Sequence, residues 1–179
     1  IGTLDYESLV ESGDPAFECR APADEWEALL LSYTSGTTGD PKGVVYHHRG
    51  AYVNALANVA VWRISGTPVY LWTLPIFHSL GWCFPWTIPL MGGVQVCLRK
   101  IDPRTIWEEL RSDVTHLCGA PTVLTMMAES SDGTPLEEPA KVMVGGAPPS
   151  PTLLARCLQL GLDVNHVYGL TETYGPIAV

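Results

Sequence analysis

The sequence predicts an α/β fold in which a mainly parallel sheet is connected by crossover helices. Short apolar runs typical of buried strands alternate with helical segments through most of the 179 residues. Glycine or proline marks most of the junctions between them. Strands joined through helices run parallel, and the ligands of such sheets lie outside the carboxyl ends of the strands. We therefore expect a functional site in the loops that follow the strands.

The first predicted elements surround a loop rich in glycine and hydroxyl side chains. Strands are expected at 29–33 and 44–47, on either side of that loop, and a helix at 49–62. Apolar residues of this helix recur at i, i+4, i+7 and i+8, which predicts one buried face. That face consists of Tyr52, Leu56, Val59 and Ala60.

The remaining elements continue the alternation of strands and helices. Strands are predicted at 69–74, 94–98, 115–118, 141–144 and 163–167. Helices are predicted at 80–91, 103–111, 121–129 and 151–160, and the first is expected to be irregular because of its prolines. Asp102 and Ser150 are suited to cap the helices that follow them, and Gly161 is suited to end the last one.

Composition excludes several classes of partner. The net charge is −9 and no basic run is present, which argues against nucleic acid and anionic membranes as main partners. The stretch 64–98 has no charged side chain, but prolines and glycines divide it into pieces shorter than the roughly 20 residues of a membrane span. We predict no transmembrane segment.

The five cysteines are Cys19, Cys83, Cys97, Cys118 and Cys157, and they show neither a CxxC pair nor zinc spacing. Their odd number and apolar neighbours predict buried thiols in a reducing compartment, and we expect the cytoplasm. The chain opens on Ile1 without an initiator Met, and it stops just after an apolar stretch at Val179. We expect it to be a piece of a longer protein.

The glycine-rich loop predicts a site for a polyphosphate. It presents four hydroxyl residues, three glycines, a proline and a lysine: Thr34, Ser35, Gly36, Thr37, Thr38, Gly39, Pro41, Lys42 and Gly43. Backbone N–H groups, hydroxyls and one lysine after a strand form an anion cradle. A Walker-type loop is disfavoured because Gly43, and not Ser or Thr, follows Lys42. The alternative is a flexible linker, although linkers rarely lie between two apolar strands.

Two further stretches follow predicted strands. Tyr168-Gly169-Leu170-Thr171-Glu172-Thr173 offers a flat ring, a bend, hydroxyls and a carboxylate that suits Mg²⁺. Val144-Gly145-Gly146-Ala147 has almost no side chains that would block a ring. The alternatives are a strand exit with an ordinary helix cap for the first stretch and a close-packed turn for the second.

One histidine, His78, lies in the apolar stretch 74–82. A hydrogen-bonded core histidine and a residue that stabilises a developing anion are both open for it. The tryptophans read as core residues, although some of Trp82, Phe84 and Trp86 are in a position to wall an acyl pocket.

The stretch 33–44 resembles the phosphate-binding signature of the AMP-forming acyl-activating enzymes, and the stretches at 145 and 168 agree with it in order and spacing. The family includes acyl-CoA synthetases, luciferases and adenylation domains. The segment 44–50 is similar to fatty-acyl-CoA synthetases. The resemblance covers about 24–179, as part of an AMP-binding domain, with 1–23 as a lead-in.

The resemblance implies an ATP-dependent acid–thiol ligase with ATP, Mg²⁺ and CoA as its small molecules. It implies that Lys42 and the loop hydroxyls hold the β- and γ-phosphates. It also implies that Tyr168 stacks on adenine, Thr171 contacts the α-phosphate and Glu172 coordinates Mg²⁺. Gly145, Gly146 and Ala147 would line the adenine pocket and the acyl groove, and His78 would be a gate beside the α-phosphate.

Other functions remain open at this point. The acceptor of the acyl group is CoA or a carrier protein, and a non-catalytic nucleotide-binding module is a rival. Short- to medium-chain fatty acids and aryl acids are equally open as substrates. The family's ribose-binding aspartate and lid lysine lie beyond its adenylate turn, so we expect little turnover from this chain alone and expect it to work with the rest of its polypeptide.

Overall fold

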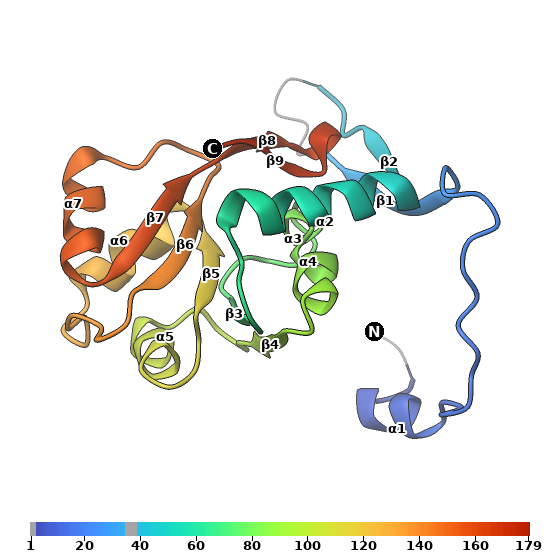
Figure 1. The fold of residues 1–179 in the computed structure, drawn as a ribbon, viewed down its shortest axis with the longest axis horizontal. Helices are drawn as coiled ribbons and strands as arrows, with labels where there is room; N and C mark the ends of the chain where they lie inside the picture. The colour runs from blue at the N-terminus through green and yellow to red at the C-terminus, as the bar shows by residue number, and fades with distance from the viewer. Residues whose placement is uncertain (1–2, 35–38) are drawn as a thin grey trace.

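The computed structural model describes residues 3–34 and 39–179 of the chain (Figure 1). Its centre is a five-stranded sheet, and the strands are β3 (Val69–Trp72), β4 (Val94–Cys97), β5 (His116–Gly119), β6 (Ala140–Val144) and β7 (Leu162–His166). They are ordered β4-β3-β5-β6-β7, and all neighbouring pairs are parallel. The predicted α/β class with a parallel sheet is therefore confirmed.

Different helices cover the two faces of this sheet. The helices α5 (Pro103–Leu110), α6 (Pro121–Glu129) and α7 (Pro151–Gln159) contribute to the buried cluster on one face. The end of α2 (His48–Trp62) and α4 (Phe84–Leu90) contribute to the cluster on the other. The central strands β3, β5 and β6 are thus buried between two layers, as their continuous apolar sequences require.

Successive side chains along a strand point to opposite faces of the sheet, so they pack into different layers. Leu71, Leu117 and Val142 belong to the cluster with α5, α6 and α7. Their neighbours Tyr70 and Cys118 belong to the opposite cluster. All five are fully buried, so successive residues of β3 and β5 point to opposite faces and both faces are packed.

The glycine-rich loop lies outside the parallel sheet. It connects β1 (Ala28–Tyr33) to β2 (Gly43–His47), and these strands form an antiparallel pair of their own. The loop therefore follows a strand of an antiparallel hairpin, whereas the stretches at 145 and 168 follow strands of the parallel sheet. The short connection of nine residues or so between two strands favours a hairpin, because a parallel crossover needs a dozen or more residues.

A second hairpin was not expected from the sequence. It pairs β8 (Tyr168–Leu170) with β9 (Gly175–Ala178), and the short 3₁₀ helix η1 (Thr171–Thr173) forms its tip. Its strands have only three and four residues and contain glycine and proline. They therefore lack the run of β-branched residues that predicts a strand. The hairpin presents the Thr171–Glu172 turn.

The predicted buried face of α2 is wrong. Tyr52 and Leu56 are 59% and 43% exposed. The buried residues of the helix are Ala51, Ala55, Asn58 and Trp62. These also recur at helical spacing, but three of them are small or polar, so counting apolar residues selects the other face. The amide nitrogen of the buried Asn58 side chain is satisfied, because Nδ2 donates hydrogen bonds to Trp82 O and Thr87 Oγ1.

The helix expected over 80–91 is two segments, α3 (Ser79–Trp82) and α4. The break consists of residues with positive φ, among them Ser79, Leu80, Trp82 and Cys83. The irregularity therefore comes from left-handed backbone at the start of the segment and not from its prolines, since Pro89 lies within α4. Such backbone is uncommon outside glycine and is typical of functional segments.

The predicted helix caps are confirmed. The Asp102 carboxylate accepts a hydrogen bond from Thr105 N at 3.1 Å, and the Ser150 hydroxyl accepts one from Leu153 N at 3.2 Å. Gly161 follows α7 with a φ of +79°, which suits a glycine.

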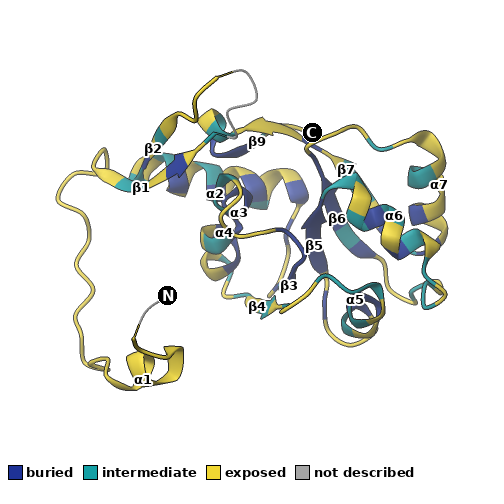
Figure 2. Cartoon of the chain, turned by 180° about the vertical axis from the view of Figure 1, so that it is seen from behind, coloured by how far each residue is buried: buried dark blue, intermediate teal, exposed yellow. Residues whose placement is uncertain are grey.

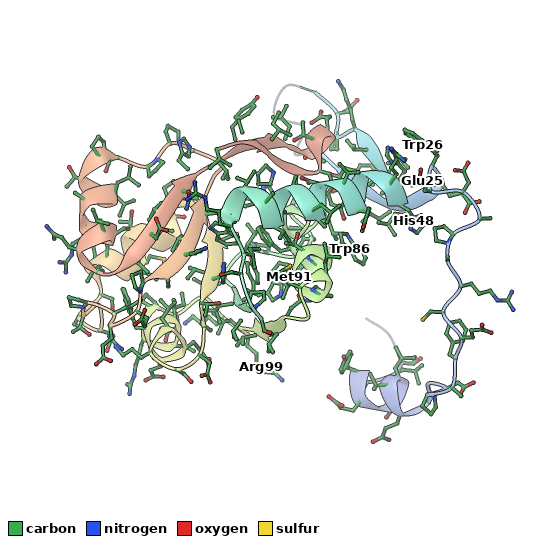
Figure 3. The ribbon with its side chains drawn as sticks, viewed as in Figure 1. Glu25, Trp26, His48, Trp86, Met91 and Arg99 are labelled. Carbon is green, nitrogen blue, oxygen red and sulfur yellow. The ribbon has the colours of Figure 1, made fainter. Side chains whose placement is uncertain are left out.

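The lead-in is exposed and joins the domain near the start of α2. The helix α1 (Tyr6–Glu11) buries none of its residues, and Figure 2 shows residues 3–23 as exposed. Arg49 pairs with Glu25 and lies over the Trp26 ring at 5.7 Å, so the segment before β1 is held at the first turn of α2 (Figure 3).

Three cysteines, Cys83, Cys118 and Cys157, are buried, but Cys19 and Cys97 are exposed. The expectation that all five are buried is therefore wrong for these two, because Cys97 ends an edge strand and Cys19 lies in the exposed lead-in. In the part of the chain that the structure describes, no helix is long and apolar enough to cross a membrane.

Candidate functional site

A small pocket gathers three of the stretches singled out in the sequence. It is lined by residues of α3, of the turns after β6 and β7, and of the second hairpin: His78, Ser79, Trp82, Gly145, Gly146, Val167, Gly169, Leu170, Gly175 and Pro176. The stretches around residues 78, 145 and 169 are far apart in sequence, and they meet here. The pocket lies after the carboxyl ends of β6 and β7, where a parallel sheet places its ligands.

Backbone forms much of the wall of this pocket. A Cβ on Gly145 would lie 2.9 Å from the Trp82 ring, whereas a Cβ on Gly146 would meet nothing within 4 Å. Gly146 also has a φ of +86°, which other residues rarely adopt. The first glycine therefore allows close packing against Trp82, and the second leaves open space at the rim.

The turn at Gly169 is even tighter. A Cβ there would lie 2.1 Å from the carbonyl oxygen of Gly175, which directly precedes Pro176, the partner of Gly169 across the hairpin. No side chain fits without separating β8 from β9, so glycine is required for the hairpin that carries η1.

The Thr171–Glu172 turn is held from two directions. The Ser79 hydroxyl donates to Thr171 Oγ1 at 3.3 Å, and the Tyr46 hydroxyl donates to the Thr171 carbonyl at 2.5 Å. Thr173 Oγ1 accepts from Leu170 N at 2.9 Å, which closes the turn on itself. Glu172 is exposed at its tip, so its carboxylate can reach a ligand outside the protein.

His78 lies at the pocket and not in the core. It is exposed and directly precedes α3, and its side chain makes no capping hydrogen bond there. The alternative of a hydrogen-bonded core histidine is therefore disfavoured, and a histidine at the rim of a pocket is available to a substrate.

The ends of the glycine-rich loop are closed by two hydrogen bonds. Lys42 N donates to Thr34 Oγ1 at 3.0 Å, and Thr34 N donates to Lys42 O at 3.0 Å. Lys42 and Gly39 are exposed. The candidates Ser35, Gly36, Thr37 and Thr38 lie outside the described residues. The structure thus places Thr34 and Lys42 together where the two strands meet the loop, and neither residue lines the small pocket.

Two other candidates lie beside the pocket without lining it. Ala147 and Tyr168 are exposed and adjoin lining residues in the chain. Tyr168 is 58% exposed, so its ring offers an open face for stacking on a base.

The donor set fits a magnesium ion that arrives with phosphates. Among residues 3–34 and 39–179, no group of three or more His, Cys, Asp or Glu side chains could hold a metal ion. Mg²⁺ is commonly bound through one or two carboxylates together with substrate phosphates, and it prefers oxygen ligands. Glu172 and the Thr171 hydroxyl supply hard oxygens at the same turn, which suits that mode.

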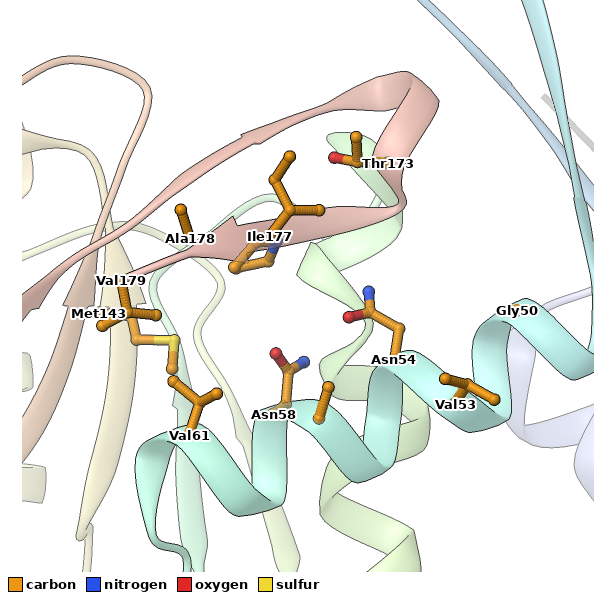
Figure 4. A pocket seen from close by; sticks show the side chains of 12 residues that line it. Gly50, Val53, Asn54, Asn58, Val61, Met143, Thr173, Ile177, Ala178 and Val179 are labelled. Atoms are coloured by element: carbon orange, nitrogen blue, oxygen red, sulfur yellow. The ribbon is translucent and has the colours of Figure 1, made fainter.

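A second, larger cavity of about 600 Å³ lies between α2 and β9 (Figure 4). Its lining is mainly apolar and consists of Gly50, Val53, Asn54, Ala57, Asn58, Val61, Met143, Thr173, Pro176, Ile177, Ala178 and Val179. Pro176 also lines the small pocket, so the two adjoin at the start of β9. An apolar cavity next to a polar one suits an acid with a carbon chain.

Of the three aromatic residues considered as walls of an acyl pocket, one lines the small pocket. Trp82 does so, whereas Phe84 is fully buried in the core and the Trp86 indole bonds Tyr174. Sequence reasoning missed Ser79, Tyr46 and the Gly175–Pro176 pair. The pair carries a turn signal directly after the Thr171–Glu172 stretch, which could have identified it.

Comparison with known proteins agrees with this geometry. The family model described as AMP-binding enzyme matches residues 2–179. The chain belongs to the AMP-binding enzyme family. Its members match at high identity: a probable acyl-activating enzyme 6 of Arabidopsis thaliana is 48% identical over 96% of the chain and 32% of that protein.

Two further relatives have names that state a substrate. A peroxisomal acetate/butyrate–CoA ligase of Arabidopsis thaliana is 46% identical over 99% of the chain and 32% of its own length. A 2-methylpropanoate–CoA ligase of Humulus lupulus is 46% identical over 95% of the chain and 31% of its length. The chain thus spans about a third of the length of the curated relatives that it matches.

Solved structures of the same family share the fold. An o-succinylbenzoate coenzyme A synthetase of Bacillus subtilis in complex with ATP and magnesium superposes with a TM-score of 0.85 at 27% identity, covering 99% of the chain and 37% of that protein. The ATP-bound MatB of Rhodopseudomonas palustris gives 0.79 at 27% identity, covering 93% and 33%.

Proposed function

We propose that this chain is the nucleotide-binding part of an enzyme that activates a small carboxylic acid with ATP. The carboxylate attacks the α-phosphorus, pyrophosphate leaves, and an acyl-adenylate forms. The thiol of CoA then takes the acyl group and AMP leaves. The observation that carries this proposal is the convergence of His78, the Gly145–Gly146 turn and Gly169 in one pocket, next to the Thr171–Glu172 turn.

The proposed roles follow from position and chemistry. Tyr168 stacks on adenine, Thr171 donates to the α-phosphate, and Glu172 holds Mg²⁺, which offsets the phosphate charge when it is bound. Lys42, with the loop that Thr34 closes, attracts the β- and γ-phosphates. His78 lies at the rim of the small pocket, where the carboxylate would meet the α-phosphorus.

We propose a short aliphatic acid as the substrate. The names of two relatives support this, since they state acetate or butyrate and 2-methylpropanoate. Trp82 packs against Gly145 in the small pocket, which leaves room there for little more than the carboxyl group. The carboxyl group would lie in the small pocket, with the carbon chain along Pro176 toward the α2–β9 cavity.

The domain limits and the compartment remain proposals too. Residues 24–179 would form the domain and 1–23 its lead-in, which fits an α1 that buries nothing. We propose the cytoplasm as the compartment. The alternative is the peroxisome, because the name of one relative states that compartment. Imaging of a fluorescent fusion in cells distinguishes the two.

The test is acid-dependent exchange of labelled pyrophosphate into ATP. The protein used has the full length of the relatives and carries this sequence, and the acids run from acetate to hexanoate, with benzoate as an aryl acid. Lys42→Ala and Glu172→Ala should each lower exchange by about tenfold to a hundredfold, because a hydrogen bond to a charged group contributes roughly 1.5–3 kcal/mol.

Lys100→Ala and Glu137→Ala are the matched controls, because both residues are exposed and lie outside the site. They should exchange like the unaltered protein. Measurable ATP binding with no exchange for any acid would indicate a nucleotide-binding module and not an enzyme. Exchange without CoA-dependent release of AMP would indicate that a carrier protein, and not CoA, accepts the acyl group.

A further inference from the structure

Four residues form a connected group between the first hairpin and the Thr171–Glu172 turn. We call Tyr46, Asn54, Trp86 and Tyr174 the aromatic clamp. Tyr46 belongs to β2, Asn54 to α2 and Trp86 to α4, and Tyr174 directly follows η1.

The centre of the clamp is a stack of two tyrosines. The rings of Tyr46 and Tyr174 lie 3.9 Å apart between centroids and are nearly parallel, at 8°. Both residues are only 5% exposed. A stacked, buried aromatic pair adds stabilisation beyond its apolar area, and it fixes the orientation of both rings.

Each end of the stack is anchored by hydrogen bonds. The Tyr46 hydroxyl donates to the Thr171 carbonyl oxygen at 2.5 Å. Trp86 Nε1 donates to the Tyr174 hydroxyl, and Asn54 Nδ2 donates to the Tyr174 carbonyl at 2.6 Å. The Trp86 side chain extends from α4 (Figure 3). The turn is therefore fixed to β2, α2 and α4 at the same time.

The Tyr46 phenol is protonated at neutral pH and can act as a hydrogen-bond donor. Burial raises the pKa of the Tyr46 phenol, with a smaller contribution from the nearby Glu172 carboxylate, and burial also raises the pKa of Tyr174. Both phenols are thus neutral, and Tyr46 keeps the proton that it donates.

The clamp connects the two parts that handle the nucleotide. Tyr46 lies on the strand that leaves the glycine-rich loop, four residues after Lys42. Thr171 and Glu172 lie on the turn whose backbone Tyr46 holds. One ATP must satisfy Lys42 at its outer phosphates and Thr171 and Glu172 at its α-phosphate and Mg²⁺, so the distance between hairpin and turn has to be fixed.

We propose that Tyr46 is a positioning residue that sets the Thr171–Glu172 turn relative to the phosphate loop, and so governs binding of Mg²⁺·ATP but not of the acid. This rests on the proposed roles of Lys42, Thr171 and Glu172. It goes beyond them because Tyr46 is 5% exposed and lines neither the small pocket nor the α2–β9 cavity.

The test compares Tyr46→Phe, which keeps the stack and removes the hydroxyl, with Tyr46→Leu, which removes both. Tyr6→Phe is the control, because Tyr6 is 74% exposed on α1. Binding of Mg²⁺·ATP is titrated by calorimetry on the full-length protein. The Mg²⁺ concentration for half-maximal pyrophosphate exchange and the KM for the acid are measured beside it, with the thermal midpoint of each variant.

Tyr46→Phe should weaken Mg²⁺·ATP binding by about threefold to tenfold, the range that one net hydrogen bond supplies. The half-maximal Mg²⁺ concentration should rise, and the KM for the acid should stay unchanged. Tyr46→Leu should weaken binding further, and Tyr6→Phe should match the unaltered protein.

Two results would overturn the proposal. One is unchanged Mg²⁺·ATP binding in Tyr46→Phe. The other is a rise of the acid KM in step with the nucleotide constant and with a fall of the thermal midpoint, which is the signature of a residue that only stabilises the fold. Unaltered protein that binds Mg²⁺·ATP without acid-dependent exchange contradicts the proposed function alone, because the nucleotide titration still decides the role of Tyr46.

Discussion

The two cavities of this molecule adjoin at Pro176, but their walls are built differently. Four of the ten residues that line the small pocket are glycines, and a side chain at Gly145 or Gly169 would collide with its neighbours, so part of this wall has to be backbone. The cavity between α2 and β9 is walled by apolar side chains, among them Val53 and Val61.

This difference separates two tasks. A wall of backbone can hardly change in shape by substitution, so the small pocket suits the part of the reaction that is the same for every acid. A wall of side chains can be altered one residue at a time, so the larger cavity suits the recognition of a particular carbon chain. The predictions below test this division.

The largest effect is expected at the backbone wall. In Gly169→Ala the added Cβ would lie 2.1 Å from Gly175 O, so β8 and β9 have to separate and the Thr171–Glu172 turn is displaced. Pyrophosphate exchange should fall by about a hundredfold or more, and overpacking should lower the free energy of unfolding by about 3 kcal/mol. Exchange assays and urea unfolding measure the two effects.

Gly92→Ala is the control for glycine loss without a collision. Gly92 has a φ of +64°, and a Cβ there meets nothing within 4 Å. This variant should lose only about 1 kcal/mol of stability and keep its exchange rate. A Gly169→Ala protein as active as Gly92→Ala would show that the wall of the small pocket tolerates change.

A smaller and selective effect is expected in the α2–β9 cavity. Ala57→Trp fills part of this cavity and should lower kcat/KM for butyrate by about tenfold while acetate is unaffected, since each excluded methylene is worth roughly 1 kcal/mol or more. Kinetics with a series of acids from two to six carbons measures the change.

Trp82→Ala is the counterpart in the small pocket. If Trp82→Ala extends the preferred chain length and Ala57→Trp leaves it unchanged, the carbon chain lies in the small pocket. That result would break the division between the two cavities.

The smallest effect concerns stability alone, at the sheet face below the larger cavity. His116 on β5 is 5% exposed and packs edge-on against Trp62 at 4.9 Å. Burial, with a contribution from Lys141, lowers the pKa of His116 from 6.5 to about 4. The unfolded chain therefore binds a proton below about pH 6.5, whereas the folded chain does so only below about pH 4.

Stability should consequently fall as the pH drops from about 6.5 to about 4, by about 3 kcal/mol at most from this group. Urea unfolding at several pH values measures the slope. His116→Gln should flatten it, and His166→Gln, which alters an exposed histidine at the end of β7, should not. An equal slope in the His116→Gln protein would show that this face of the sheet is accessible to water.

Local signals in the sequence were enough for the framework of the fold. Asp102 and Ser150 indicated where two helices begin, because their side chains cap the first turn. Apolar runs located the five parallel strands. The stretches at 145 and 169 could be found because glycine and hydroxyl residues follow strands. His78 could be found as a single histidine in an apolar stretch, and all three line one pocket.

What the sequence did not reveal depends on contacts across long distances in the chain. The helix α2 carries two stripes at helical spacing, and only its neighbours decide that Ala51 and Ala55 are buried while Tyr52 is exposed. The bond from Tyr46 to Thr171 joins residues 125 positions apart. No local pattern marks it, and the same holds for the pairing of β8 with β9 around η1.

The central claim is that an acid is activated by attack on the α-phosphorus of ATP, and an isotope transfer tests it most directly. The full-length protein is supplied with butyrate carrying ¹⁸O in both carboxylate oxygens, together with ATP, Mg²⁺ and CoA, and the nucleotide products are examined by mass spectrometry. The proposal predicts AMP that contains one ¹⁸O atom and pyrophosphate that contains none. Label in orthophosphate together with ADP, or unlabelled AMP, would contradict it.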